Sequence, residues 1–337
     1  MKRLGFIWIP LCFAACSLID DNLSVCSEAL LLDYELELHT ELSMQLETEL
    51  VMETEEPVRN ALSNWLAPIF TDKAKDVDLR FFSVDTDELR RLIQEDINDN
   101  RTSYTFQLPK ENYMHLGVAN ISENEQVHLS DAQHAQTMQL VVSERGDLPS
   151  FTTGVFTARM HMEIGDTSQQ FDVRLYMATC AVAIVLDTTI CDSLVSIGGW
   201  MSGAARSFSV RDSIYTYDGR QKLMFEEVPV NYAPAAVPHR MKQASNERPF
   251  VCVATSGFPT ADEESWSISM TTTLTNDRHT TTTLKIGEPV RAGTLRLIRA
   301  HVDGEGAIQP DEDVDQEIGV SIELDWKQGS DHEIDLE

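Results

Sequence analysis

Alternation of apolar and polar residues predicts that most of the chain forms β-strands. Between residues 32 and 38 the even positions are apolar and the odd positions are acidic, a period of two that is typical of a half-buried strand. The same parity continues to Met52. Leu42, Leu46 and Leu50 would also fit one face of a helix, but the long alternation favours a strand.

Further short segments with strand-forming residues recur along the chain and are separated by turn residues. Strands are expected at residues 77–81, 104–108, 113–118, 127–129, 138–142, 155–164, 173–186, 266–274, 280–286, 295–301 and 318–326. Residues 58–70 are expected to be helical or irregular, and Asp85 is expected to cap a short helix over residues 86–97.

Many short strands joined by turns predict β-sandwiches, and 337 residues are enough for two of them. We expect the boundary at the turn Gly165-Asp166, just before the long apolar strand. The N-terminal sandwich would then comprise residues 29–165, and the C-terminal sandwich would comprise residues 166–337.

The start of the chain has the features of an export signal. Two basic residues precede LGFIWIPLCFAA, an almost wholly apolar stretch that is too short to span a bilayer as a helix. Two alanines lie directly before Cys16, which resembles the bacterial lipobox, where lipid is attached to the cysteine. We expect residues 1–15 to be a signal peptide and residues 16–28 to be a tether lipidated at Cys16. An ordinary signal peptide followed by a chance cysteine is the alternative.

The charge balance limits the partners. Asp and Glu number 55 against 26 Lys and Arg, and the formal net charge is −29 at pH 7. Nucleic-acid binding needs clustered basic side chains, so a nucleic-acid partner is not expected. No later stretch is apolar enough to span a bilayer, so the expected membrane attachment is the lipid on Cys16.

The sequence contains no recognisable catalytic or metal-binding motif. The nine histidines are scattered, and neither CxxC spacing, a GxSxG motif nor a phosphate-binding glycine loop occurs. We therefore expect no enzymatic activity, no cofactor and no small-molecule substrate. The acidic loop 303–315 could offer carboxylate oxygens to Ca²⁺, but it lacks the order of an EF-hand, and a solvated loop is the favoured interpretation.

The cysteines and three short triplets leave questions open. Beyond Cys12 and Cys16, the remaining cysteines are Cys26, Cys180, Cys191 and Cys252. A local bridge between Cys180 and Cys191 and free buried thiols are both compatible with the sequence.

Triplets of the form Asp-Ser/Thr-X begin at Asp187, Asp192 and Asp212. They resemble an O-glycosylation signal of some Gram-negative bacteria, although motifs this short also arise by chance.

Eight segments carry a resemblance through their order and spacing. They are ACSLIDDNLSVC, YELELHT, VDLRFF, LPKENYMHLGVAN, GVFTARMHM, VRLYMATCAVAIVLD, GEPVRAGTLRLIRAHVDGEG and VSIELDWKQGSDHEIDL. Together they resemble the minor fimbrial subunits of Bacteroidales type V pili, which are the lipid-retaining anchor proteins of the fimbrillin superfamily. Residues 187–250 depart most from this pattern.

The resemblance implies a mostly β protein with two tandem transthyretin-like, Greek-key β-sandwiches and minor helical insertions. It also implies a structural lipoprotein in cell adhesion, held at the outer membrane and cell surface by lipid such as palmitate on Cys16. Such a protein would anchor or terminate a fimbrial polymer, with subunits of the same pilus as partners. The family polymerises by strand exchange, and the candidate partner-strand residues are Ile318, Val320, Ile322, Leu324 and Trp326.

Two alternatives remain beside this interpretation. The strand that begins at Ile318 would also fit an ordinary internal strand. The protein could instead be a surface lipoprotein that binds a glycan or a host protein. That function predicts an exposed aromatic platform, for which Trp200, Tyr215 and Tyr217 are the candidates.

Overall fold

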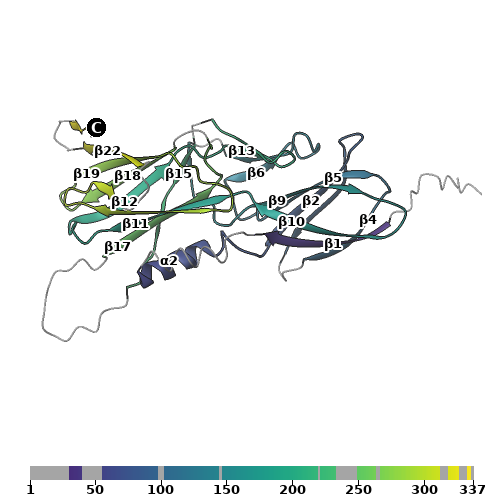
Figure 1. Cartoon of the computed structure of the whole chain (residues 1–337), viewed down its shortest axis with the longest axis horizontal. Coiled ribbons are helices and arrows are strands. Elements are labelled where there is room, and N and C mark those ends of the chain that lie inside the picture. The colour runs from purple at the N-terminus through teal and green to yellow at the C-terminus, as the bar shows by residue number, and fades with distance from the viewer. Residues whose placement is uncertain are drawn as a thin grey trace, which may run out of the picture.

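The structure is a computed structural model that describes residues 30–39, 55–97, 102–143, 146–218, 221–232, 249–262, 266–311, 318–325 and 332–334. Within these residues, the strands form four sheets, and one helix, α2, lies beside them (Figure 1). The expected mostly β fold class is confirmed.

One seven-stranded sheet folds over on itself to make the N-terminal sandwich. Its order is β3-β2-β5-β9-β10-β1-β4. Between β9 and β10 only Thr157↔Tyr176 and Phe156↔Met177 are in register, so the sheet turns a corner there. Phe81 of β2 and Phe106 of β4 lie far apart in this order, yet their ring centroids are 5.0 Å apart, because the two layers face each other. The strands are β1 (Leu30–His39), β2 (Asp76–Ser83), β3 (Leu89–Asp96), β4 (Ser103–Leu108), β5 (Asn112–Ala119), β9 (Phe156–Glu163) and β10 (Gln169–Met177).

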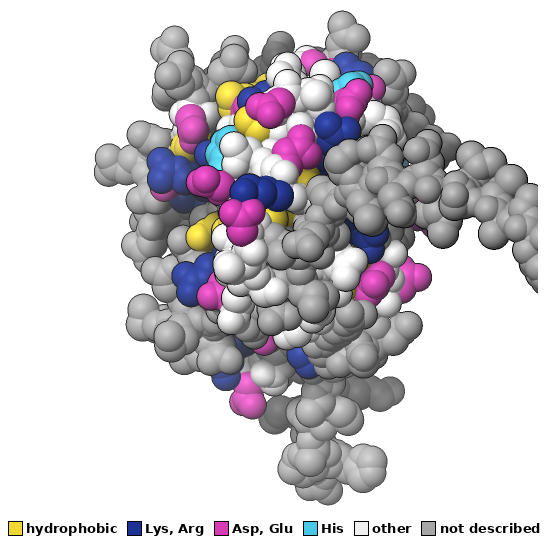
Figure 2. Space-filling model, turned by 90° about the vertical axis from the view of Figure 1, so that its right-hand side faces the viewer, with side chains coloured by type: hydrophobic (Ala, Val, Ile, Leu, Met, Phe, Trp, Pro, Cys, Tyr) yellow, Lys and Arg dark blue, Asp and Glu magenta, His cyan; other side chains and the backbone are white. Residues whose placement is uncertain are grey.

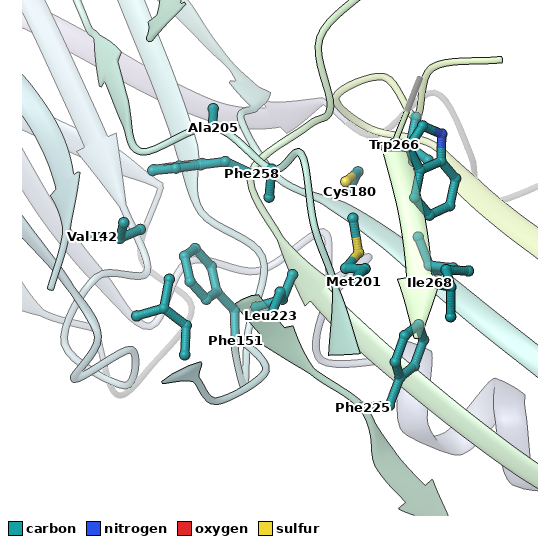
Figure 3. Close-up of a cluster of buried hydrophobic side chains, with 14 of the residues drawn as sticks. Val142, Phe151, Cys180, Met201, Ala205, Leu223, Phe225, Phe258, Trp266 and Ile268 are labelled. Carbon is teal, nitrogen blue, oxygen red and sulfur yellow. The ribbon is translucent and has the colours of Figure 1, made fainter. Parts of the chain in front are cut away.

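The C-terminal sandwich has two sheets, ordered β16-β17-β11-β20-β21 and β23-β22-β19-β18-β12-β15-β8. Ile184 and Ile298 from the first sheet and Trp266 and Ile268 from the second share one buried core. Figure 3 shows Trp266 and Ile268 in this core. The strands are β8 (Asp147–Leu148), β11 (Cys180–Asp187), β12 (Leu194–Met201), β15 (Lys222–Met224), β16 (Glu226–Val228), β17 (Phe250–Gly257), β18 (Trp266–Leu274), β19 (His279–Ile286), β20 (Leu295–Val302), β21 (Ile308–Pro310), β22 (Ile318–Asp325) and β23 (His332–Ile334).

A four-stranded sheet, β14-β13-β7-β6, joins the two halves of the chain. Phe208 of β13 lies opposite Leu140 of β7, and both side chains belong to the buried cluster that includes Leu116 of β5 and Ile184 of β11. The core therefore runs without interruption from one sandwich into the other. The strands are β6 (Val127–Ser130), β7 (Gln139–Val142), β13 (Ser207–Ser209) and β14 (Ile214–Thr216).

Helix α2 (Glu56–Leu66) comes from the N-terminal half but contacts β16 and β17 of the C-terminal sandwich. Val58, Leu62 and Leu66 repeat every four residues and are fully buried, as expected for the apolar stripe of a helix that packs on a sheet. They share a buried cluster with Ala183 of β11 and Cys252 of β17, and Figure 1 shows α2 alongside these strands. The helix covers the outer face of the five-stranded sheet.

The chain after α2 is held by the segment that leads into β9. The hydroxyl of Thr153 and the backbone amide of Gly154 both donate to the carbonyl of Pro68, at 2.8 and 3.3 Å. A Cβ on Gly154 would overlap the carbonyl oxygen of Ile69. This close approach of two backbones requires glycine.

The helix expected over residues 86–97 is wrong. Residues 89–96 form β3, which pairs antiparallel with β2 and places Ile93 opposite Leu79. The side chains of β3 are mostly exposed, so its charged residues stay in water in either conformation. Pairing with the buried strand β2 overrides the local helical preference.

The long strand expected at 173–186 is in fact two strands in different sheets. Met177 ends β10, Cys180 begins β11, and the chain changes sheet between them. The boundary expected at 165/166 therefore does not coincide with a change of sheet. Both strands have buried positions, so the apolar pattern continues across the break.

A fully buried histidine lies in the core of the N-terminal sandwich. The ring of His115 stacks on Phe81 with centroids 4.4 Å apart, and its Nδ1 donates to the carbonyl of Arg80 at 2.9 Å. Burial disfavours the charged imidazolium and lowers the pKa of His115 to about 4. The side chain is therefore neutral at pH 7.

Substituting Gly154→Ala should lower the free energy of unfolding by about 1–3 kcal/mol, since overpacking forces backbone to move. Urea denaturation measures the change. Gly165→Ala is the matched control, because a Cβ there would meet nothing within 4 Å, and its effect should stay within ~0.5 kcal/mol. Equal stability of the two variants would contradict the close approach at Ile69.

Stability should decrease as the pH falls from 6.5 towards 4. In that window the unfolded chain protonates His115 at its ordinary pKa of 6.5, whereas the folded chain does not until about 4, so acid favours unfolding. The full effect is about 3 kcal/mol. His115→Asn replaces the imidazole N–H donor with an amide N–H donor and cannot titrate. Denaturation at a series of pH values should give a shallower pH dependence for this variant, and an unchanged slope would contradict the assignment.

Candidate functional site

The lipid-attachment site lies outside the described residues. Cys16 and the tether 16–28 precede β1, the first described strand, so lipidation stays a prediction. Within the described part of the chain, no helix combines the length and apolar character that crossing a bilayer requires.

The candidate partner strand is β22, which contains four of the five expected residues. It pairs antiparallel with β19 along its whole length, from Ile318 opposite Ile286 to Asp325 opposite His279. The four apolar positions lie opposite residues of β19 that are fully or almost fully buried: Ile286, Leu284, Thr282 and Thr280. Trp326 lies outside the described residues.

On the other side of β22, the described residues pair with only part of the strand. The three residues of β23 are in register with Ile322, Glu323 and Leu324. Among the described residues, no strand is in register with 318–321 on that side. Main-chain groups on an incompletely paired edge are the groups to which a further strand can bind.

The described part of the acidic loop forms a tight turn. The carboxylate of Asp303 accepts hydrogen bonds from the backbone amides of Glu305 (2.8 Å) and Ala307 (2.9 Å), and Glu305 pairs with Arg278 at 3.1 Å. The carboxylates of Asp303 and Glu305 therefore have partners within the protein. The described residues contain no group of three or more His, Cys, Asp or Glu side chains placed to hold a metal ion, and 312–315 lie outside them.

Three cysteines are buried and form no disulfide bond: Cys180, Cys191 and Cys252. The local bridge considered between Cys180 and Cys191 is therefore absent, and the interpretation of these three residues as small apolar side chains is confirmed. Burial raises the pKa of Cys180 and of Cys252 to about 12, because the thiolate cannot be solvated. Cys26 lies outside the described residues.

The aromatic platform expected for a ligand-binding lipoprotein is not formed. Tyr215 points into the protein, and its hydroxyl donates to the carbonyl of Ala178 at 2.8 Å. Tyr217 donates to a backbone carbonyl as well. Trp200 is partly buried on β12, and the Nζ atom of Lys222 lies 4.5 Å from its ring centroid. The three aromatic side chains therefore do not share one exposed face.

A buried ion pair on β2 has no counterpart in the sequence expectations. Arg80 donates to both carboxylate oxygens of Asp78 at 2.6 and 2.9 Å, and Gln94 of β3 donates to the same carboxylate at 2.6 Å. Arg80 also donates to the carbonyl of Ala132, between β6 and β7, at 2.7 Å. The pair therefore fixes the β6–β7 connection against β2. Its sequence signal is two opposite charges at i and i+2 on either side of the apolar Leu79.

A second polar cluster fixes the turn after β5. Asp76 accepts hydrogen bonds from the backbone amides of Ile121 and Ser122, both at 3.0 Å. Asn120 adopts a positive φ of 63°, which Asn tolerates better than most residues, and its Oδ1 atom accepts from the amide of Lys75 at 2.7 Å. These contacts position the loop beside the chain that follows α2.

The end of the molecule formed by the N-terminal sandwich carries charges of both signs. In Figure 2 its described Lys and Arg side chains are interspersed with Asp and Glu, and hydrophobic side chains lie singly or in small groups among them. This face therefore has no large patch of one charge among its described side chains.

No family model and no curated protein matches the chain. Solved structures do match its fold. A candidate adhesin from Bacteroides thetaiotaomicron has a TM-score of 0.53 at 8% identity, over 88% of this chain and 97% of that chain. A candidate adhesin from Bacteroides ovatus has a TM-score of 0.50 at 10% identity, over 91% of this chain and 96% of that chain.

A weaker match is the fimbrial anchor protein Mfa2 from Porphyromonas gingivalis. Its TM-score is 0.46 at 11% identity, over 88% of this chain and 97% of that chain. The two stronger matches are enough to establish the fold. The chain therefore has the tandem β-sandwich fold of these Bacteroides candidate adhesins.

Proposed function

We propose that the protein is a structural, non-enzymatic lipoprotein of the bacterial surface that anchors or terminates a fimbrial polymer at the outer membrane. The observation that carries the proposal is the tandem-sandwich fold, which the chain shares over 88% of its length with a candidate adhesin. The ordered segments that resemble fimbrial anchor subunits add the fimbrial part of the proposal.

The membrane end of the anchor is Cys16. The small residues before it and the apolar signal stretch support removal of residues 1–15 and attachment of lipid to the new N-terminus. Stable anchoring requires two or more acyl chains, because one chain binds a bilayer only marginally. The acidic tether 16–28 then separates the lipid from the folded protein.

The polymer end is β22. Strand addition needs main-chain donors and acceptors in a row, together with alternating side-chain positions. Residues 318–321 offer such a row on the side of β22 where no described strand is in register with them. A strand from a neighbouring subunit would extend the seven-stranded sheet there.

Cys16→Ala should abolish incorporation of fatty acid into the protein. The test is metabolic labelling with a radioactive or alkyne-bearing palmitate, followed by gel analysis of the purified full chain. Cys26→Ala is the matched control and should keep the label, since it leaves the lipobox intact. Label retained in Cys16→Ala would move the lipid elsewhere and contradict the anchor site.

Deleting the whole protein from its bacterium should release fimbriae into the medium or change their length, because the polymer loses its terminal attachment. Electron microscopy of cells and immunoblotting of culture supernatant measure this. The wild-type copy should restore attachment, and the Cys16→Ala copy should not. Fimbriae of normal length that remain on the deleted cells would contradict an anchoring role.

A further inference from the structure

We propose that Ser213 is an O-glycan attachment site. It is the central residue of Asp212-Ser213-Ile214, one of three Asp-Ser/Thr-X triplets whose third residue is threonine or aliphatic; the triplets at Asp85 and Asp166 end instead in Asp87 and Ser168. The third residues of the triplets are Thr189, Leu194 and Ile214. The three triplets look equivalent in the sequence, but the structure gives their hydroxyl-bearing residues three different environments.

Ser213 lies at the tip of the β13–β14 hairpin, and all three residues of its triplet are exposed. Ile214 is 61% exposed, which is unusual for a large apolar side chain. Ser213 has a positive φ of 56°. The side chain of Ser213 makes no hydrogen bond to another described residue, whereas its backbone amide donates to the carbonyl of Ser209 at 2.9 Å. A transferase therefore finds the hydroxyl accessible and unengaged.

Local hydrogen bonds fix the shape of the turn. The hydroxyl of Ser209 donates to the carboxylate of Asp212 at 3.1 Å and accepts from the backbone amide of Asp212 at 3.3 Å. The carbonyl of Arg211 accepts from the guanidinium of Arg159 on β9 at 2.9 Å. These contacts hold Asp212 and Ser213 in one conformation in the turn, directly before Ile214 begins β14, as recognition on a folded protein requires.

The base of the hairpin is anchored in the core. Tyr215 directly follows the triplet, its hydroxyl donates to the carbonyl of Ala178, and its ring lies 4.6 Å from that of Phe208 between centroids. The triplet is therefore presented on a rigid support at the edge strand β14. A bulky hydrophilic glycan there fits in solvent without disturbing the core.

The other two triplets are poorly placed for modification. Thr188 is 1% exposed and its amide donates to the carbonyl of Pro249, so a glycan on its hydroxyl would require local unfolding. Ser193 is partly buried, and its carbonyl accepts from the amide of Thr275 at 2.8 Å. Burial therefore distinguishes one accessible triplet from two inaccessible or hindered ones.

The modification is a glycosyl transfer from an activated donor, a glycan held as a polyprenyl diphosphate. The oxygen of the Ser213 hydroxyl bonds to the anomeric carbon, and the bond from that carbon to the diphosphate oxygen breaks. The diphosphate leaves with the bonding electrons, and the hydroxyl proton passes to a base on the transferase. No oxidation or reduction is involved. The proposal rests on the export included in the proposed function, because such a donor acts on the far side of the inner membrane.

The test uses the full chain purified from its own bacterium and measured by mass spectrometry of intact protein and peptides. The peptide containing residues 212–214 should carry added hexose-type mass. Ser213→Gly removes the hydroxyl but suits the positive φ, and it should lose all of that mass. Asp212→Asn keeps the hydroxyl and should also lose it, because the triplet is broken. Ser193→Ala is the control and should leave the glycan in place.

An unmodified 212–214 peptide in the wild-type protein would overturn the proposal. So would added mass at Thr188 or Ser193, or a glycan that persists in Ser213→Gly. Peptide mapping of Cys16 in the same preparation separates the two claims. Lipid on Cys16 without a glycan on Ser213 removes only this inference, whereas the absence of both points to failure of export and overturns the proposed function as well.

Discussion

Burial of α2 against the C-terminal sandwich is the contact on which the arrangement of the two halves depends. Val58, Leu62 and Leu66 are fully buried, and each buried aliphatic side chain contributes roughly 1.5–3 kcal/mol. The helix lies in sequence between strands of the N-terminal sandwich, so its packing ties the two sandwiches together. The four-stranded sheet does the same on another side, because β7 and β13 come from different halves. The two sandwiches therefore form one continuous body and are not two domains joined only by a linker.

This construction suits a protein that bears load between two ends. Figure 1 places β1 in one sandwich and β22 at the far end of the other. β1 lies inside its sheet, parallel to β10 from Leu32 to His39 and antiparallel to β4 from Leu30 to Glu35. Under the proposed anchoring function, a pull on the segment before β1 would load these hydrogen bonds together, since they run across the strand. The continuous core would then transmit the load to the C-terminal sandwich.

Sequence patterns predicted the strands well where one face is buried and the other is exposed to solvent, because apolar and polar residues then alternate with a period of two. The hairpin of β18 and β19 is such a case, with alternating buried and half-buried side chains. The patterns failed at β3, where exposed charges carry no strand signal. They also failed at Ala178-Thr179, where the half-buried strand β10 is followed by the buried strand β11 without a charged gap. They also could not indicate that α2 packs on the distant strand β17, because an apolar stripe on a helix does not identify the strand that it contacts.

The candidate site divides in the same way. The apolar alternation placed Ile318, Val320, Ile322 and Leu324 in a strand, and β22 contains them, but register and edge exposure come from long-range pairing with β19 and β23. The Asp-Ser/Thr-X triplets at Asp187, Asp192 and Asp212 looked alike in the sequence, because burial is a property of the fold. Tyr215 appeared suited to a surface platform. In the structure its hydroxyl donates to the carbonyl of Ala178 and its ring packs inward, which the sequence alone does not reveal.

The central claim is that one copy of this protein ends the fimbrial polymer at the cell. Immunogold electron microscopy of intact cells, with antibodies raised against the C-terminal sandwich, tests it most directly. The account predicts gold at the cell-proximal end of each fimbria and none along the shaft. Gold distributed regularly along the shaft, or on the cell surface without relation to fimbriae, would contradict it.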